Sequence, residues 1–179
     1  MMTQSLVRAA QVIRQGGLVA YATEHCFGLG CDPQNERAVA RLLRVKRRSP
    51  DKGLIVIAAD AGQLAPYVAA IPPQVAVTWP GPHTWLVEPS KRAPRWITGK
   101  HPRIAVRVTA HPQAAALCRA AGMAIVSTSA NRTGQQPARD YRDVLHRFGG
   151  VVDCVVAGRV GDLPAPTPIR DAVTGQSIR

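Results

Sequence analysis

The stretch Ala124-Ile125-Val126-Ser127-Thr128-Ser129-Ala130-Asn131 is an apolar run that leads into a turn of small polar residues. Its β-branched apolar part predicts a buried strand over residues 124–127. Ligands of open α/β sheets bind at the carboxyl ends of strands, so these hydroxyls and the amide could hold a carboxylate, a phosphate or a ribose. A turn rich in Ser and Asn is also a common structural feature, and the stretch alone does not separate these interpretations.

Strand and helix patterns alternate on both sides of this stretch. Short apolar runs predict further strands at 18–21, 54–57, 84–87, 104–108 and 151–156. Apolar spacing and caps predict helices from about 6 to a Gly16-Gly17 stop, from a cap at Asn35, over 112–121, and from a cap at Asp140 to Phe148. The tail, 167–179, is expected to form a hairpin around Thr174-Gly175. This alternation predicts an α/β fold whose sheet is largely parallel or mixed and is covered by helices on both faces.

The length of the chain fits one domain spanning residues 1–179. The Pro- and Gly-rich stretches at 72–82 and 132–137 are short, so we interpret them as loops within that domain. No apolar run approaches the roughly 18 residues of a membrane span, and no secretory signal opens the chain. We therefore expect a cytoplasmic protein without a membrane partner, whose four cysteines are reduced thiols.

The chain is strongly basic, with a formal net charge of +12 and 19 arginines against four lysines. Arginine presents a planar fork of donors that suits phosphate oxygens. A polyanionic partner is one inference from this charge: a nucleotide, tRNA or both. The other is a general bias of the solvated surface toward arginine.

The densest basic stretch is residues 44–54, Arg-Val-Lys-Arg-Arg-Ser-Pro-Asp-Lys-Gly-Leu. Cations favour the last turn of a helix, which is one explanation for them. However, Pro50 and Gly53 give the run a defined loop shape, so Lys46, Arg48 and Lys52 could converge on one polyphosphate or on a nucleic-acid backbone.

Two further positions carry unusual charge. The loop 22–30 follows a predicted strand and contains Glu24, which could act as a base or pair with a nearby arginine; ion pairing is the favoured role. Arg107 lies inside an otherwise apolar strand, where a buried charge is costly unless it is paired. It therefore meets either a carboxylate of the protein or one from a ligand.

Several common site motifs are missing from the sequence. There is no phosphate loop of the GxxxxGK[ST] type, no GxSxG and no HExxH. Pro33 stands where a dinucleotide fingerprint would have its third glycine. The five histidines are too scattered along the chain to suggest a metal cluster, so no metal ligands are predicted.

Taken together, the loops resemble the YrdC/TsaC family of threonylcarbamoyl-AMP synthases over nearly the whole chain, in its short single-domain bacterial form. Seven segments in order carry the resemblance: 22–24 with 28–30, 46–48, 51–55, 79–82, 105–108, 127–131 and 169–171. The sequence departs from the family at several points, among them Ala22 for proline and His25 for threonine or alanine. The resemblance implies a twisted open α/β sheet with a positively charged concave face.

The resemblance also implies roles for individual residues. Lys46, Arg48, Ser129 and Asn131 match the family's KxR…SxN tetrad, which lines the ATP site, with Lys46 and Arg48 in the catalytic role. Further ATP contacts are implied for Lys52 and the final residue, Arg179. Threonine is expected to be held by Thr23, Arg107, Ser127 and Thr167, with Arg107 pairing its carboxylate.

The implied reaction converts L-threonine, bicarbonate and ATP, with Mg²⁺ accompanying the ATP, into threonylcarbamoyl-AMP and pyrophosphate. A downstream threonylcarbamoyl-transferase complex would then modify an adenosine of tRNA. Two alternatives stay open: a non-catalytic protein that binds RNA through its basic face, and a carbamoyl-transfer relative with another acceptor.

Overall fold

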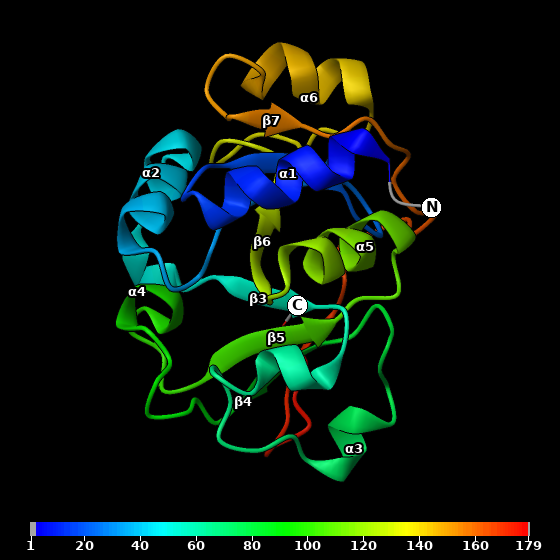
Figure 1. The fold of residues 1–179 in the computed structure, drawn as a ribbon. Helices are drawn as coiled ribbons and strands as arrows, with labels where there is room; N and C mark the ends of the chain where they lie inside the picture. The colour runs from blue at the N-terminus through cyan, green and yellow to red at the C-terminus, as the bar shows by residue number, and fades with distance from the viewer. Residues whose placement is uncertain (1–2, 179) are drawn as a thin grey trace.

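The computed structural model describes residues 3–178, and all strands of this part of the chain form one eight-stranded sheet. The spatial order is β7-β1-β2-β6-β3-β5-β4-β8 (Figure 1). The pairs β1–β7, β3–β5 and β4–β8 are parallel and the other four antiparallel, so the sheet is mixed. The strands are β1 (Val19–Ala22), β2 (Phe27–Gly30), β3 (Ile55–Ala58), β4 (Thr84–Val87), β5 (Ile104–Val108), β6 (Ile125–Ser129), β7 (Cys154–Val155) and β8 (Ile169–Asp171).

Helices cover both faces of this sheet, as expected. The α-helices are α1 (Gln4–Arg14), α2 (Glu36–Lys46), α3 (Pro73–Ala76), α4 (Arg95–Thr98), α5 (Pro112–Ala121) and α6 (Tyr141–Phe148), with short 3₁₀ helices at Pro50–Lys52 and Ala61–Leu64. The predicted caps hold α2 and α6 at their first turns: Asn35 accepts from the Ala38 amide and Asp140 from the Asp143 amide. None of the helices in the described part is long and apolar enough to cross a membrane.

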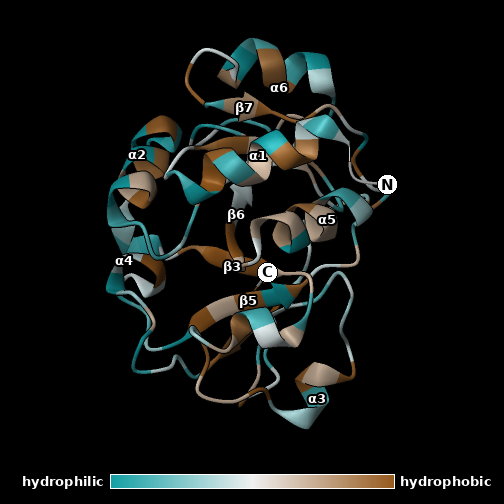
Figure 2. Ribbon diagram, in the orientation of Figure 1, coloured by the Kyte–Doolittle hydropathy of each residue, from teal (hydrophilic) through white to brown (hydrophobic). Residues whose placement is uncertain are grey.

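Alternating side chains of the strands supply two separate cores. Under α1 and α5, Ile13 and Leu117 pack with Tyr21, Ile57 and Ile125. The next residues along the strands point to the opposite face, where α2 and α6 cover them in the larger core. Figure 2 shows the corresponding pattern, because β3 is brown while α1 alternates between brown and teal.

The α1–α5 face is only partly covered. Ile125 of β6 and Ile57 of β3 lie beneath the two helices. Ser127 and Ile55 share that face by alternation, two residues along each strand, but they line an open cavity. The strand ends that carry Ser127 and Ser129 are thereby left accessible on the same side as α1 and α5.

The strand β2 was not predicted, because Gly28 and Gly30 made residues 22–30 look like a loop. The glycines are needed for close approach within the hairpin of β1 and β2. A Cβ at position 30 would come within 2.9 Å of the Tyr21 ring and closer still to the Val126 carbonyl oxygen. Pairing with β2 also extends β6 to Ser129, so part of the predicted polar turn is strand.

The end of the chain differs in one detail from expectation. The predicted strand 151–156 was too long, because the amides of Val151 and Val152 bond to the Phe148 carbonyl and complete the turn after α6. Only Cys154–Val155 is assigned to β7. The tail hairpin is confirmed through Ile178, with Arg170 opposite Ser177 and a left-handed Gly175 at φ 70°.

These contacts predict that Gly30→Ala lowers the free energy of unfolding by about 1–3 kcal/mol, the usual cost of inserting a methyl group into a packed site. Gly150→Ala is the matched control, because a Cβ there meets nothing within 4 Å. Urea unfolding followed by circular dichroism measures both. Equal stabilities for the two variants would contradict the close approach of β2 to β6 and Tyr21.

Candidate active site

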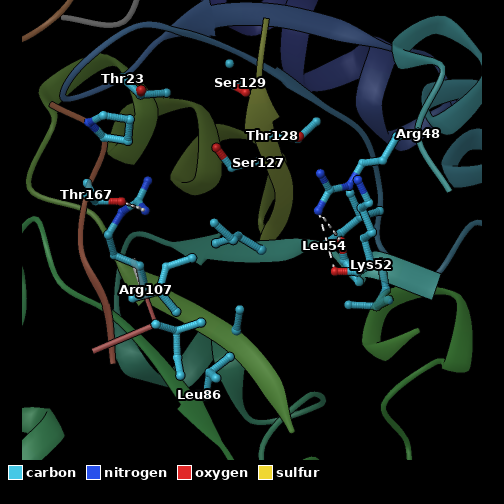
Figure 3. A pocket seen from close by; sticks show the side chains of 18 of the residues that line it. Thr23, Arg48, Lys52, Leu54, Leu86, Arg107, Ser127, Thr128, Ser129 and Thr167 are labelled. Carbon is cyan, nitrogen blue, oxygen red and sulfur yellow. Dashed lines mark hydrogen bonds between the residues drawn. The ribbon is translucent and has the colours of Figure 1, made fainter. Parts of the chain in front are cut away.

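A cavity of about 480 Å³ lies on the open part of the α1–α5 face. Its volume falls in the range of small-molecule sites, roughly 300–1,000 Å³. Residues from β2, β3, β4, β5, β6 and β8 and from the loops after β1 and α2 line it (Figure 3). Of the residues chosen from the sequence, the lining includes Thr23, Arg48, Lys52, Arg107, Ser127, Ser129, Asn131 and Thr167.

One end of the cavity is built around Arg107, whose side chain is almost fully buried. Its Nη1 donates to the hydroxyls of Thr84 (2.8 Å) and Thr167 (3.1 Å), and its Nη2 donates to Glu24 Oε2 (3.3 Å). Thr109 donates to the other oxygen of Glu24 at 2.6 Å. The expected ion pair of Glu24 is therefore confirmed, and it answers the charge of Arg107 from within the protein.

The opposite end carries Arg48 and Lys52 (Figure 3). Helix α2 ends at Lys46, and the next residue, Arg47, adopts the left-handed conformation at φ 52° and turns the chain so that Arg48 reaches the cavity. Arg48 Nη2 donates to the Gly53 carbonyl at 3.0 Å. Burial lowers the pKa of Arg48 from its ordinary value, and its Nε has no hydrogen-bond partner among the described residues. This end therefore offers cationic donors to an incoming anion.

Lys46 lies behind the cavity and is not part of its lining. Only 3% of its surface is exposed. Its ammonium donates to the carbonyl oxygens of Ser129 and of Asn131, the latter at 2.8 Å. The Thr133 amide in turn donates to the Lys46 carbonyl at 3.0 Å. The two halves of the predicted tetrad are thus joined physically, with Lys46 fixing the end of β6 to the end of α2.

The side chains of Ser129 and Asn131 form the edge of the cavity. Ser129 Oγ donates to Asn131 Oδ1 at 2.5 Å, and the Asn131 amide donates to the Gln135 carbonyl at 2.9 Å. These bonds hold the turn after β6 in one conformation. With Ser127 on the same strand, the turn places a row of hydroxyl groups between the two cationic ends.

The charge of the lining has one sign. Arg48, Lys52, Arg103 and Arg107 line the cavity, and no aspartate or glutamate is among its described lining residues. Within residues 3–178, no group of three or more His, Cys, Asp or Glu side chains is placed to hold a metal ion. The arrangement therefore favours anions with two separated charged groups.

Some features of the site were not predicted. Sequence patterns alone predict no contact for Thr84 or for Thr109, yet the two hydroxyl groups hold Arg107 and Glu24 in place. The antiparallel register of β4 and β5 is what brings Thr84 beside Arg107. Arg103 lines the cavity while pairing with Asp171 at 3.1 Å. Arg179, an expected ATP contact, lies outside the described residues.

Comparison with known proteins identifies the family. A sequence model of Sua5, YciO and YrdC proteins, described as "Telomere recombination", matches residues 11–179. The chain belongs to this family. Its arrangement of a mixed sheet with a cavity at the ends of β2 and β6 is therefore the version of the family fold that this sequence forms.

Several relatives match over nearly full length. A threonylcarbamoyl-AMP synthase of Halorhodospira halophila is 54% identical over 96% of this chain and 92% of its own. Synthases of the same name from Methylobacillus flagellatus and Coxiella burnetii are 52% and 48% identical, over 93% and 99% of this chain and 94% and 97% of theirs.

Solved structures agree with the fold. Sua5 of P. abyssi complexed with L-threonine superimposes with a TM-score of 0.89 and 32% identity over 96% of this chain. This chain spans about half (52%) of that protein. E. coli YciO has the same fold, with a TM-score of 0.81 and 24% identity over 97% of this chain and 89% of its own.

The burial of Lys46 gives a prediction about its titration. Burial, with the nearby charge of Arg48, lowers the pKa of Lys46 from 10.5 to about 8. Between these values the unfolded chain binds a proton that the folded chain has lost, so the contribution of Lys46 to stability rises with pH from 8 to 10.5. Below pH 8 the cost of burying its charge is fully present.

The measurement is the chemical shift of the lysine ε-carbon in protein labelled at its four lysines. One signal is expected to titrate near pH 8 and to vanish in Lys46→Met. Lys100 is the internal comparison, since its exposed ion pair with Asp51 raises its pKa. Titration of all four signals above pH 10 would contradict the buried position of Lys46.

Proposed function

We propose that this chain is a threonylcarbamoyl-AMP synthase, which joins L-threonine, bicarbonate and ATP into threonylcarbamoyl-AMP and pyrophosphate. The observation that carries the proposal is a single cavity with cationic groups at both ends, hydroxyls between them and no carboxylate among its described lining residues. Threonine and ATP both bring anionic groups to such a site. Relatives that are 48–54% identical over almost the whole chain carry this enzyme name.

ATP occupies the end formed by Arg48 and Lys52 in this proposal. Both side chains line the cavity, and the buried Nε of Arg48 lacks a partner among the described residues. Ser129 and Asn131, which form the edge of the cavity, also bind the nucleotide, and Arg179 is a further contact. Lys46 contributes by holding the carbonyls of that edge in place, because its ammonium already donates to two of them.

Threonine occupies the end formed by Thr23, Arg107, Ser127 and Thr167. Arg107 is held by Glu24 and two threonine hydroxyls, so its guanidinium has one fixed orientation at the cavity. The carboxylate of threonine, when bound to Arg107, would share the guanidinium with Glu24.

The proposed chemistry needs no covalent enzyme intermediate. The threonine amine takes up CO₂ derived from bicarbonate, a carbamate oxygen attacks the α-phosphate of ATP, and pyrophosphate leaves. Charge that builds on the phosphate oxygens is stabilised by Arg48 and Lys52, which are in place before the reaction begins. Mg²⁺ enters as the partner of the ATP phosphates, since no carboxylate among the described lining residues is available to hold it, and we assign it no step.

The product is reactive and serves tRNA modification in the proposed role. A threonylcarbamoyl-transferase complex takes it over and acts on an adenosine of tRNA, which places this chain in the cytoplasm. The basic surface is compatible with contact to that RNA.

The direct test is incubation of the protein with ATP, L-threonine and labelled bicarbonate. A labelled adenylate and an equal amount of pyrophosphate are expected, each dependent on all three substrates. Tight tRNA binding without product would favour the RNA-binding alternative. Product with another amino acid but not with threonine would favour a carbamoyl-transfer relative with a different acceptor.

The two ends of the cavity predict opposite kinetic effects. Arg107→Met alone would leave Glu24 as an unpaired buried charge, so the informative variant is Arg107→Met with Glu24→Gln. We expect its KM for threonine to rise roughly ten- to a hundredfold, since a hydrogen bond to a charged group is worth about 1.5–3 kcal/mol. Its KM for ATP is expected to change much less.

Arg48→Gln is the matched variant at the other end, and its expected pattern is reversed, with the larger rise in the KM for ATP. Steady-state kinetics with each substrate varied in turn measures both. Equal changes in the two KM values for either variant would contradict the assignment of separate ends.

A further inference from the structure

The proposed reaction releases a proton that the residues assigned so far do not accept. Threonine enters from neutral solution as an ammonium ion. Ammonium and bicarbonate together give a carbamate, one water and one proton. The nitrogen loses two protons as the carbamate forms: one is consumed when bicarbonate becomes CO₂ and water, and the other needs a base to accept it. The later attack on the α-phosphate involves an oxygen that is already anionic.

The lining of the cavity leaves few groups that can take this proton. No aspartate or glutamate lines it within the described residues, and the carboxylate of Glu24 is engaged by Arg107 and Thr109. The remaining candidates are His25, Cys26 and His101. A thiol accepts a proton poorly. His101 is exposed and also lines a neighbouring groove beside Lys100.

His25 is held in one orientation at the threonine end. Its Nδ1 lies 2.8 Å from the Leu163 carbonyl oxygen. A carbonyl can only accept, so Nδ1 carries the hydrogen, and in the neutral ring Nε2 carries the free lone pair. The segment that supplies this carbonyl is itself fixed to the same loop, because the Gly161 amide donates to the Thr23 carbonyl at 2.9 Å.

The position of His25 in the chain places it beside the groups assigned to threonine. Thr23 lines the same cavity, and Glu24 pairs with Arg107 at 3.3 Å. The segment after Leu163 continues to Pro166 and Thr167, which line the cavity, and Thr167 bonds Arg107. The loop 23–26 and the segment 161–167 therefore enclose the end of the cavity that is assigned to threonine.

We propose that His25 Nε2 is the base that accepts the proton from the threonine nitrogen as the carbamate forms. This inference rests on the proposed function. The ammonium proton is consumed as bicarbonate becomes CO₂ and water, which leaves a neutral amine. Its nitrogen lone pair forms a bond to the carbon of CO₂, one C=O π pair moves to oxygen, and the N–H electrons stay on nitrogen as the second proton moves to Nε2. The imidazolium then returns the proton to solvent, and the carbamate proceeds to the α-phosphate.

The charge of the cavity favours loss of a proton from the substrate nitrogen. Four cationic side chains line it and no described carboxylate does, so a positive charge on the substrate nitrogen is disfavoured there. Release of the proton from His25 Nε2 to solvent regenerates the base in each turnover.

The test compares three variants in the assay for labelled adenylate at one pH. His25→Gln keeps an N–H donor for the Leu163 carbonyl but has no basic nitrogen, and kcat is expected to fall about a hundredfold, the lower range for loss of a general base. His25→Gly is expected to lose as much and to regain part of its rate with added imidazole. His101→Gln is the matched control, with a rate close to wild type.

The rescue separates a base from a structural residue, since a collapsed loop would not respond to imidazole. A kcat for His25→Gln within about twofold of wild type would overturn the inference. So would a loss in His25→Gly that imidazole does not restore. In both cases product formation by the wild-type protein would leave the proposed function standing, whereas a wild-type protein without product would contradict that function and this inference with it.

Discussion

The geometry of the site depends on one buried ammonium group. Lys46 ends α2 and donates to two carbonyls at the end of β6, while Thr133 donates back to the Lys46 carbonyl. This contact joins residues more than 80 positions apart in the sequence. It fixes the hydroxyl groups of Ser127 and Ser129 relative to the loop that carries Arg48. A charge in this position is costly, and the lowered pKa of Lys46 reflects it. A lysine that merely touched substrate would not need to be buried so completely.

A second buried network gives the cavity its charge. Glu24 lies beside the site, yet its two oxygens face Arg107 and Thr109. The pairing lowers the cost of burying Arg107 and at the same time removes the carboxylate from the cavity. The lining consequently stays cationic while the protein beneath it is locally balanced. An exposed Glu24 would compete with an anionic substrate for the same guanidinium.

Much of this arrangement could be predicted from the sequence where short-range rules decide it. The caps at Asn35 and Asp140 depend on residues three positions apart, and both were predicted. Gly28 and Gly30 led to the wrong prediction of a loop. Glycine is required there because Tyr21 and Val126, on neighbouring strands of the sheet, leave little room for a side chain. The burial of Lys46 could not be predicted from the sequence for the same reason. A run of basic residues at the end of a helix does not indicate which of them is buried, because contacts with distant segments decide it.

The strand pairings explain why residues so distant in sequence meet at one cavity. The antiparallel pairing of β6 with both β2 and β3 brings the end of β6 beside the hairpin loop 23–26 and beside the start of β3. Parallel pairing of β3 with β5 then places Arg107 two residues along the sheet from Ile55 on the same face. A fully parallel sheet would gather these ends along one edge. The mixed sheet instead spreads two cationic ends across one open face, which is the shape that two anionic substrates and a reacting centre between them require.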